Sequence, residues 1–211
     1  MFPALLLHIS LTFSQSALLS SGVRAAAVTE AAAIWAPRGV LVDAGEPSSP
    51  IVLTVVTSPI AVRVFDRPLG AIVFGADGAP HPRIILYAKA IVDLVRSVRF
   101  LGVEESQWPP ELRDRIVGRV VGRVLAHEIG HYVLRSRGHT EDGLMRSFQR
   151  ADDLVGVPRA GFTPAPIEDG VATRSGIETA DDDSKREASA CADSAARKAG
   201  AVPGAGGRRP R

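Results

Sequence analysis

One uninterrupted segment of the chain constrains its fold most strongly. It begins at Pro109 and Pro110, which suit the first positions of a helix, and Glu111 suits the positive end of the helix dipole. No further proline interrupts the segment before about Arg135. The sequence therefore predicts one long helix here. Its apolar residues and two histidines recur at helical spacing, at Ile116, Val120, Val124, His127, His131 and Leu134.

Small residues form a row along the same segment, four positions apart: Gly118, Gly122, Ala126 and Gly130. Residues with this spacing lie on one face of a helix. Each glycine inside a helix costs roughly 1 kcal/mol relative to alanine. A row of them therefore indicates a face that another stretch of backbone approaches closely.

Composition sets the class of the protein and the kinds of site that it can build. The chain has 211 residues, which favours one domain plus tails, and its 5% aromatic content predicts a core of aliphatic residues. The formal net charge is +2, and no basic stripe with interleaved aromatics supports nucleic-acid binding. The single cysteine, Cys191, cannot form a disulfide within the chain. Any metal site must therefore use histidines and carboxylates.

The start of the chain has features of an export signal. An apolar stretch from Phe2 to Leu19 precedes the small residues Ala25, Ala26 and Ala27, which suit a cleavage site. We expect a signal peptide over 1–27 and a secreted or periplasmic protein without a stable membrane span. The alternatives are a misassigned start or a buried helix, because no Lys or Arg precedes the apolar stretch.

Short strands and a second helix are predicted around the long helix. A helix is expected at 29–36, and strands at 39–45, at 51–58, on both sides of Arg67-Pro68, and at 83–88, turning helical from Ala90. Asp77-Gly78 indicates a hairpin. We expect one domain over 28–160 and a low-complexity, disordered tail over 161–211.

The long helix carries the pattern H-E-x-x-H, as His127-Glu128-Ile129-Gly130-His131. Histidines four apart lie one turn above another on the same face, so both can bind one zinc ion. Glu128 lies about 100° around the helix, so it can miss the metal and still reach a water molecule bound to it. The pattern predicts a zinc site with Glu128 as the general base.

A catalytic zinc usually has three protein ligands and one open position. His139 is the favoured third ligand, because Gly138 can end the helix and let the chain fold back. Four carboxylates are the alternatives: Glu141, Asp142, Asp152 and Asp153.

The segment "HEIGHYVLRSRGHTEDGLM" resembles the active-site segment of zincin metallopeptidases, and among them the matrixin-like metzincins. The resemblance implies that His127, His131 and His139 bind Zn²⁺, that Glu128 is the catalytic base and that Met145 belongs to a methionine turn below the metal. It also implies an α+β fold, in which a twisted mixed sheet packs against an N-terminal helix and the H-E-x-x-H helix. The antiparallel edge strand of the family binds extended substrate, and 83–88 is the candidate for it.

Together these features predict an exported zinc metalloendopeptidase that acts on a peptide or protein substrate. Two other classes stay open: a zinc-binding protein without turnover, and a secreted binding module with a fortuitous motif. An amide substrate other than a peptide is also open. Arg135, Arg137 and Arg146 lie close to the histidines in sequence. They are either a solvated helix end or contacts to a substrate carbonyl or carboxylate.

Overall fold

The computed structural model describes residues 7–14, 19–45, 49–58, 68–147 and 149–167. The chain divides into two compact units, Met1–Ile167 and Glu168–Arg211, and all described residues belong to the first.

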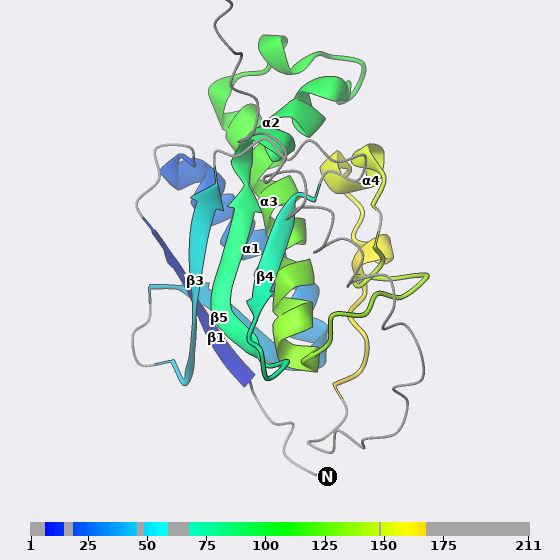
Figure 1. The fold of residues 1–211 in the computed structure, drawn as a ribbon. Helices are drawn as coiled ribbons and strands as arrows, with labels where there is room; N and C mark the ends of the chain where they lie inside the picture. The colour runs from blue at the N-terminus through cyan, green and yellow to red at the C-terminus, as the bar shows by residue number, and fades with distance from the viewer. Residues whose placement is uncertain (1–6, 15–18, 46–48, 59–67, 148, 168–211) are drawn as a thin grey trace, which may run out of the picture. The chain divides into compact units, whose positions relative to one another are not determined.

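A five-stranded sheet forms the centre of the first unit (Figure 1). The order across the sheet is β2-β1-β3-β5-β4. Every pairing is parallel except that of β4 with β5, so β4 is an antiparallel edge strand. The strands are β1 (Leu7–Phe13), β2 (Val40–Ala44), β3 (Ile51–Ser58), β4 (Gly70–Phe74) and β5 (Pro80–Tyr87).

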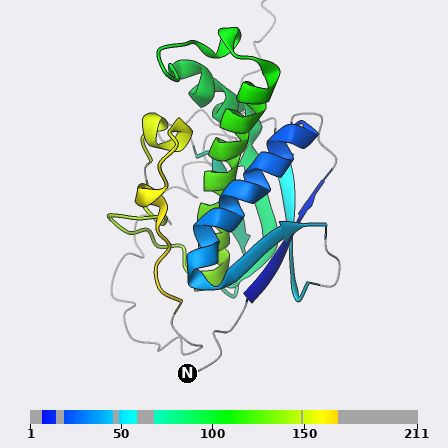
Figure 2. The ribbon, with the colours of Figure 1, turned by 180° about the vertical axis from the view of Figure 1, so that it is seen from behind.

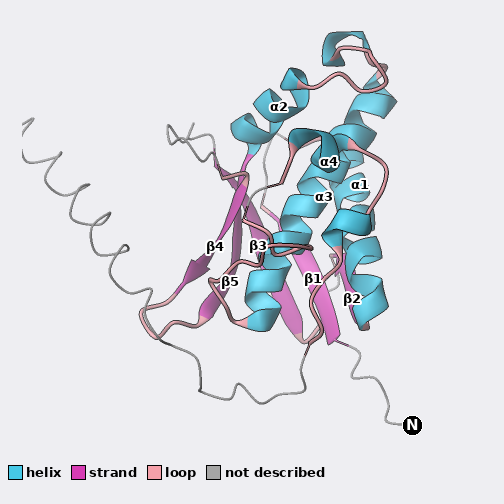
Figure 3. Cartoon of the chain, turned by 90° about the vertical axis from the view of Figure 1, so that its right-hand side faces the viewer, coloured by secondary structure: helices cyan, strands magenta, loops and turns pink. Residues whose placement is uncertain are grey.

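Helices cover one face of this sheet, as Figure 2 shows. The long helix α3 contacts α1 and also the strands β4 and β5, and the turned view in Figure 3 shows it beside the sheet. Among the described residues, no helix is both long and apolar enough to cross a bilayer. The helices are α1 (Ser21–Trp35), α2 (Ala88–Ser97), α3 (Pro110–Leu134) and α4 (Ala151–Val155), with short 3-10 turns at Ala36–Arg38, Glu105–Gln107 and Ala160–Phe162.

Two members of the row of small residues on α3, Gly118 and Gly122, receive the backbone of α1, so the predicted close approach of backbone is confirmed there. A side chain at Gly118 would lie 2.8 Å from the carbonyl oxygen of Val23, and one at Gly122 would lie 2.6 Å from that of Ala27. The two helices can approach this closely only because both positions lack a Cβ atom.

A buried ion pair joins the same two helices. Arg123 Nε on α3 donates to Glu30 Oε1 on α1 at 2.9 Å, and Arg159 Nη2 donates to Glu30 Oε2 at 2.7 Å. Arg123 also donates to four backbone carbonyls of α4 and of the segment after it, which are those of Asp153, Leu154, Val157 and Pro158. Arg123 thereby fixes the segment 153–158 against α3.

The N-terminal segment differs from the prediction. Strand β1 lies in the interior of the sheet between β2 and β3, and its residues Ile9 and Leu11 are fully buried. Helix α1 begins at Ser21, before the expected helix start at Thr29. Strand β1 and the start of α1 thus lie within 1–27, the segment expected to be a signal peptide, and cleavage of that segment stays a prediction.

The edge-strand prediction needs correction, and one core residue lies just past the expected domain end at residue 160. That residue is Phe162, which is 3% exposed. The segment 83–88 lies in β5, an interior strand, and the antiparallel edge strand is β4. The strand expected before Arg67 and the tail from residue 168 onward lie outside the described residues.

Candidate metal centre

The last turns of α3 carry His127 and His131 on one face, as their spacing predicted. The two ring centroids lie 4.7 Å apart, and His139 lies 5.3 Å from the first ring and 5.0 Å from the second. One nitrogen atom from each of the three imidazoles lies within 4.8 Å of the others. The three side chains therefore lie close enough together to hold one metal ion.

Backbone carbonyls hold two of these rings in place. His127 Nδ1 donates to the carbonyl oxygen of Leu144 at 2.8 Å, and His131 Nδ1 donates to that of Ser136 at 2.7 Å. A carbonyl oxygen can only accept, so the proton of each neutral ring is on Nδ1. This fixes both Nε2 atoms as the free lone pairs, an arrangement typical of metal-binding histidines.

The two Nε2 atoms face each other at 3.0 Å. With both Nδ1 atoms protonated, neither neutral ring has an Nε2 proton to share, so two lone pairs point at the same space. A cation between them satisfies both. This arrangement favours a metal site over a histidine pair that only hydrogen-bonds within the protein.

Burial keeps these histidines neutral near pH 7. Desolvation lowers the pKa of His127 to about 4, although the hydrogen bond to Leu144 opposes that shift. Desolvation likewise lowers the pKa of His131 and of His139. Neutral imidazole is the form that binds a metal, so proton competition is weak at this cluster.

The turn that brings His139 to the cluster begins earlier than predicted. Helix α3 ends at Leu134, and Arg135 rather than Gly138 has the left-handed conformation, with φ of 48°. The chain then reverses through Ser136, whose carbonyl binds His131 and whose hydroxyl accepts from the Gly138 backbone N–H at 3.0 Å. The reversal thus orients one ligand and delivers another.

Glu128 lies beside the cluster and is 5% exposed. Burial raises the pKa of its carboxyl to about 8, and a hydrogen bond from the backbone of Ile72 in β4 opposes the shift. A side chain at Gly70 would lie 3.1 Å from Glu128 Oε1, so the edge strand packs directly against this carboxyl. The carboxyl is therefore poorly solvated and close to the histidines, where a proton acceptor can act.

Met145 lies below the histidine helix. It is 3% exposed, and its sulfur occupies the space where Gly130 lacks a side chain. Its carbonyl accepts from the Thr140 backbone N–H at 2.9 Å, and Gly143, with φ of 77°, makes the turn. The turn packs the residues around Met145 and Leu144 against α3 under the site.

The histidines and Glu128 line a cleft of about 950 Å³. One wall consists of β4, including Gly70 and Ile72, and the other consists of the segment from Leu144 to Phe162. Residues of α2 close one end of the cleft.

The alternative carboxylate ligands are not brought to this point. Within the part of the chain that the structure describes, the group of side chains positioned for one metal ion is His127, His131 and His139. Asp153 instead contacts Arg146, with 3.4 Å between Oδ2 and Nη2. The three histidines that the sequence singled out therefore lie together, and their role as metal ligands stays a prediction.

The supporting groups were not found from the sequence. The Leu144 and Ser136 carbonyls are backbone atoms, which no residue pattern distinguishes. Trp35 Nε1 donates to the Ala126 carbonyl at 3.0 Å just before the first histidine, through a pairing of distant segments. Arg123 was detectable in principle, because it is a charged residue inside a run of buried valines.

Comparison with models of protein families, with curated proteins and with solved structures gave no match.

Proposed function

We propose that the protein is a zinc-dependent peptidase whose metal ligands are His127, His131 and His139. The convergence of three neutral imidazoles beside a buried carboxyl, in a cleft walled by an edge strand, carries the proposal. Two zinc ligands at 2.0–2.1 Å in tetrahedral geometry lie about 3.3 Å apart. The observed Nε2 separation of 3.0 Å is close to that value.

Three histidine ligands leave one position of a tetrahedral zinc free. A bound zinc ion supplies Lewis acidity, which activates a water molecule and polarises a peptide carbonyl. The rigid carbonyl contacts to His127 and His131 keep their lone pairs directed at the ion while this occurs.

Glu128 serves as the general base in this proposal. A divalent cation nearby favours the carboxylate form and so lowers the pKa that burial raises. Glu128 then takes a proton from the attacking water and passes it to the leaving amine. Because Gly70 has no Cβ atom, β4 leaves the Glu128 carboxyl room to contact the attacking water and the leaving amine.

The antiparallel edge strand β4 supplies the substrate wall. Its outer backbone edge lies along the cleft, where an extended peptide can pair with it. An antiparallel edge strand beside the H-E-x-x-H helix and a methionine turn below it are the features that the resemblance to metzincins implies. They support a peptide substrate over a small amide.

The test compares wild type with Glu128→Gln on an unfolded protein substrate. We expect the variant to keep one zinc per chain and to lose about 10²- to 10⁴-fold in kcat/KM, the usual contribution of a general base. Glu141→Gln is the matched control, because Glu141 is exposed on the loop beyond the third histidine. Unchanged hydrolysis by Glu128→Gln would contradict the mechanism.

A zinc-loaded wild type that cleaves no unfolded substrate would instead support a zinc-binding protein without turnover.

A further inference from the structure

Four charged side chains line the cleft outside the histidine cluster and Glu128: Asp93, Arg123, Arg137 and Arg146. Arg123 is saturated by Glu30 and by backbone carbonyls. Asp93 pairs with Lys89, with 2.8 Å between Oδ2 and Nζ. Arg137 stacks on the ring of Phe74, 4.8 Å from its centroid.

Arg146 is the least satisfied of these groups. Its Nη2 donates to the amide oxygen of Gln149 at 2.8 Å and lies 3.4 Å from Asp153 Oδ2, a long contact to a side chain that is 47% exposed. Within the described residues its Nε is buried and has no hydrogen-bond partner. A guanidinium whose partners are one neutral amide and one weak ion pair retains capacity to bind an anion.

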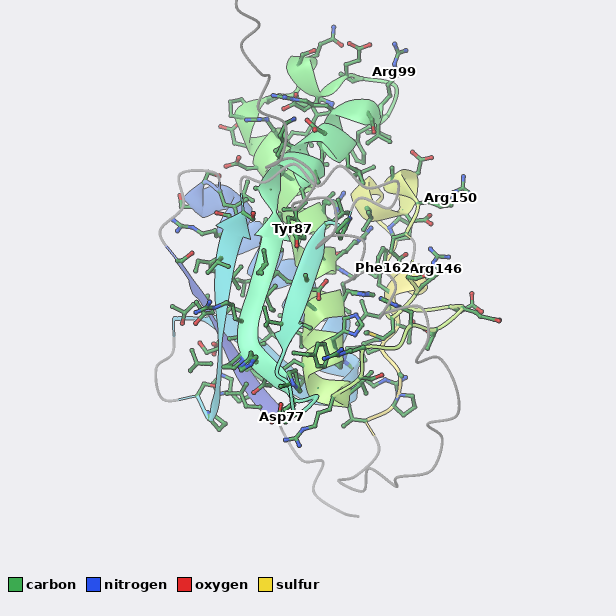
Figure 4. All side chains as sticks on the ribbon, in the orientation of Figure 1. Asp77, Tyr87, Arg99, Arg146, Arg150 and Phe162 are labelled. Atoms are coloured by element: carbon green, nitrogen blue, oxygen red, sulfur yellow. The ribbon has the colours of Figure 1, made fainter. Side chains whose placement is uncertain are left out.

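Arg146 also has a fixed place relative to the histidines. It follows Met145, and it lies two residues after Leu144, whose carbonyl holds His127. Its backbone N–H contacts the Gly143 carbonyl at 3.4 Å. Figure 4 shows it near Phe162, on the side of the molecule where α4 lies. The guanidinium therefore belongs to the wall opposite β4.

We propose that Arg146 binds a carboxylate of the substrate on the α4 side of the metal centre, so that the protein selects acidic peptides. This inference rests on the proposed peptidase function. The planar guanidinium matches a carboxylate with two parallel hydrogen bonds. Leu144, Leu154 and Phe162 line the same cleft, and apolar surroundings strengthen such a pairing.

The location of Arg146 limits where the carboxylate lies along the substrate. Because Arg146 lines the same cleft as the histidines, we expect the carboxylate close to the scissile bond, at a position that the test identifies. A glutamate or aspartate side chain and a free C-terminal carboxylate share this chemistry, and the test distinguishes them.

The test measures binding rather than turnover. Zinc-loaded Glu128→Gln protein is titrated with matched peptides, each carrying one glutamate or one glutamine at successive positions, with amidated C-termini. A second arm compares the all-glutamine peptide with a free and with an amidated C-terminus. We expect about a 10- to 100-fold tighter Kd for the acidic member of one pair, as for hydrogen bonds to charged groups.

Variants then assign that preference to Arg146. Adding Arg146→Gln should remove it, and Arg146→Lys, which retains the charge without the fork, should keep only part of it. Arg150→Gln is the control, because Arg150 is exposed and points outward beside α4 in Figure 4. Thermal unfolding and zinc content establish that each variant is folded. If Arg146→Gln does not fold, Arg146→Lys alone is used to test the role of Arg146.

The outcomes separate this proposal from the proposed function. Equal affinity for acidic and neutral peptides, no binding of either, or a preference that survives Arg146→Gln would overturn the carboxylate site. Hydrolysis by wild type without charge preference would overturn it as well and leave the peptidase intact. An Arg146-dependent preference in a wild type that hydrolyses nothing would support this site and reject turnover.

Discussion

Glycine residues allow close packing in both halves of α3, but the group that packs against them differs. In the first half, Gly118 and Gly122 make room for the backbone of α1, and in the second half Gly130 makes room for the side chain of Met145. The first contact joins two helices through backbone atoms that cannot move independently. The second positions a flexible side chain under the histidines. A row of small residues therefore predicts close packing, but its partner decides whether that packing serves the fold or the site.

The two halves also differ in how they treat charge. The part of α3 that ends at Arg123 neutralises this arginine with Glu30 in a fully buried pair. The second half buries Glu128 without a countercharge and carries His127 and His131, whose pKa values desolvation lowers. Stability should therefore depend mainly on the first half, and metal binding and pH sensitivity on the second.

The largest effect on stability is expected from Glu30→Ala. It leaves Arg123 buried without its countercharge, which typically costs 3–5 kcal/mol in the free energy of unfolding. Urea unfolding monitored by tryptophan fluorescence measures this loss. Exposed Glu104→Ala is the control and should change the free energy by less than about 1 kcal/mol. A Glu30→Ala loss no larger than the control would remove the assigned role of the pair.

The next effect is a pH dependence of the metal-free protein. Glu128 has a pKa raised to about 8, so above pH 6.5 the folded chain binds a proton that the unfolded chain has lost. Stability should fall by about 2 kcal/mol between pH 6.5 and 8. Below pH 6.5 the lowered pKa of His127, about 4, has the opposite effect on stability. Stability then falls as the pH falls, because the unfolded chain binds the proton at a higher pH than the folded chain does.

Unfolding curves of the metal-free protein at several pH values measure this slope. Glu128→Gln should show no fall between pH 6.5 and 8, since no carboxyl remains to titrate. A fall of the same size in that variant would assign the slope to another group.

A smaller effect is expected from Gly122→Ala. The new methyl group would lie 2.6 Å from the Ala27 carbonyl oxygen, and the backbone of α1 must shift to admit it. Overpacking of this kind costs about 1–3 kcal/mol, partly offset by the better helix propensity of alanine. The zinc Kd should stay unchanged, as measured by calorimetric titration of the folded variant. Gly161→Ala, which meets no atom within 4 Å, is the matched control.

The smallest effect on stability should follow Gly130→Ala. Met145 is unbranched and can move aside, so we expect a loss below about 1 kcal/mol. Zinc affinity should nevertheless fall about tenfold, because Met145 and the Leu144 carbonyl belong to the turn that orients His127. Equal changes in zinc affinity for Gly122→Ala and Gly130→Ala would remove the distinction between the two halves.

Local patterns were sufficient for much of the fold. Proline positions and helical spacing located α3, β-branched runs located β2 and β3, and Asp77-Gly78 located the β4–β5 hairpin. Strand β1 was missed because its apolar composition also suits an export leader. The alternation of Ile9, Leu11 and Phe13 with polar residues was the available signal for a strand.

The order of strands depends on pairing between distant segments, so the sequence did not identify β4 as the edge. For the site, the spacing of His127 and His131 on one helix defined the pair, and His139 was found as a histidine after the helix end. The turn at Arg135 and the carbonyl partners were not predictable, because φ at a non-glycine residue and the direction of a backbone oxygen follow from tertiary packing.

Zinc binding by wild type and by His139→Ala tests the central claim most directly. Both proteins are stripped of metal and titrated with zinc, with metal content after dialysis as a second measure. Three convergent imidazoles predict one tightly bound zinc per wild-type chain and at least about 100-fold weaker binding by the variant. Wild type without stoichiometric zinc, or equal affinity of the two proteins, would contradict the account.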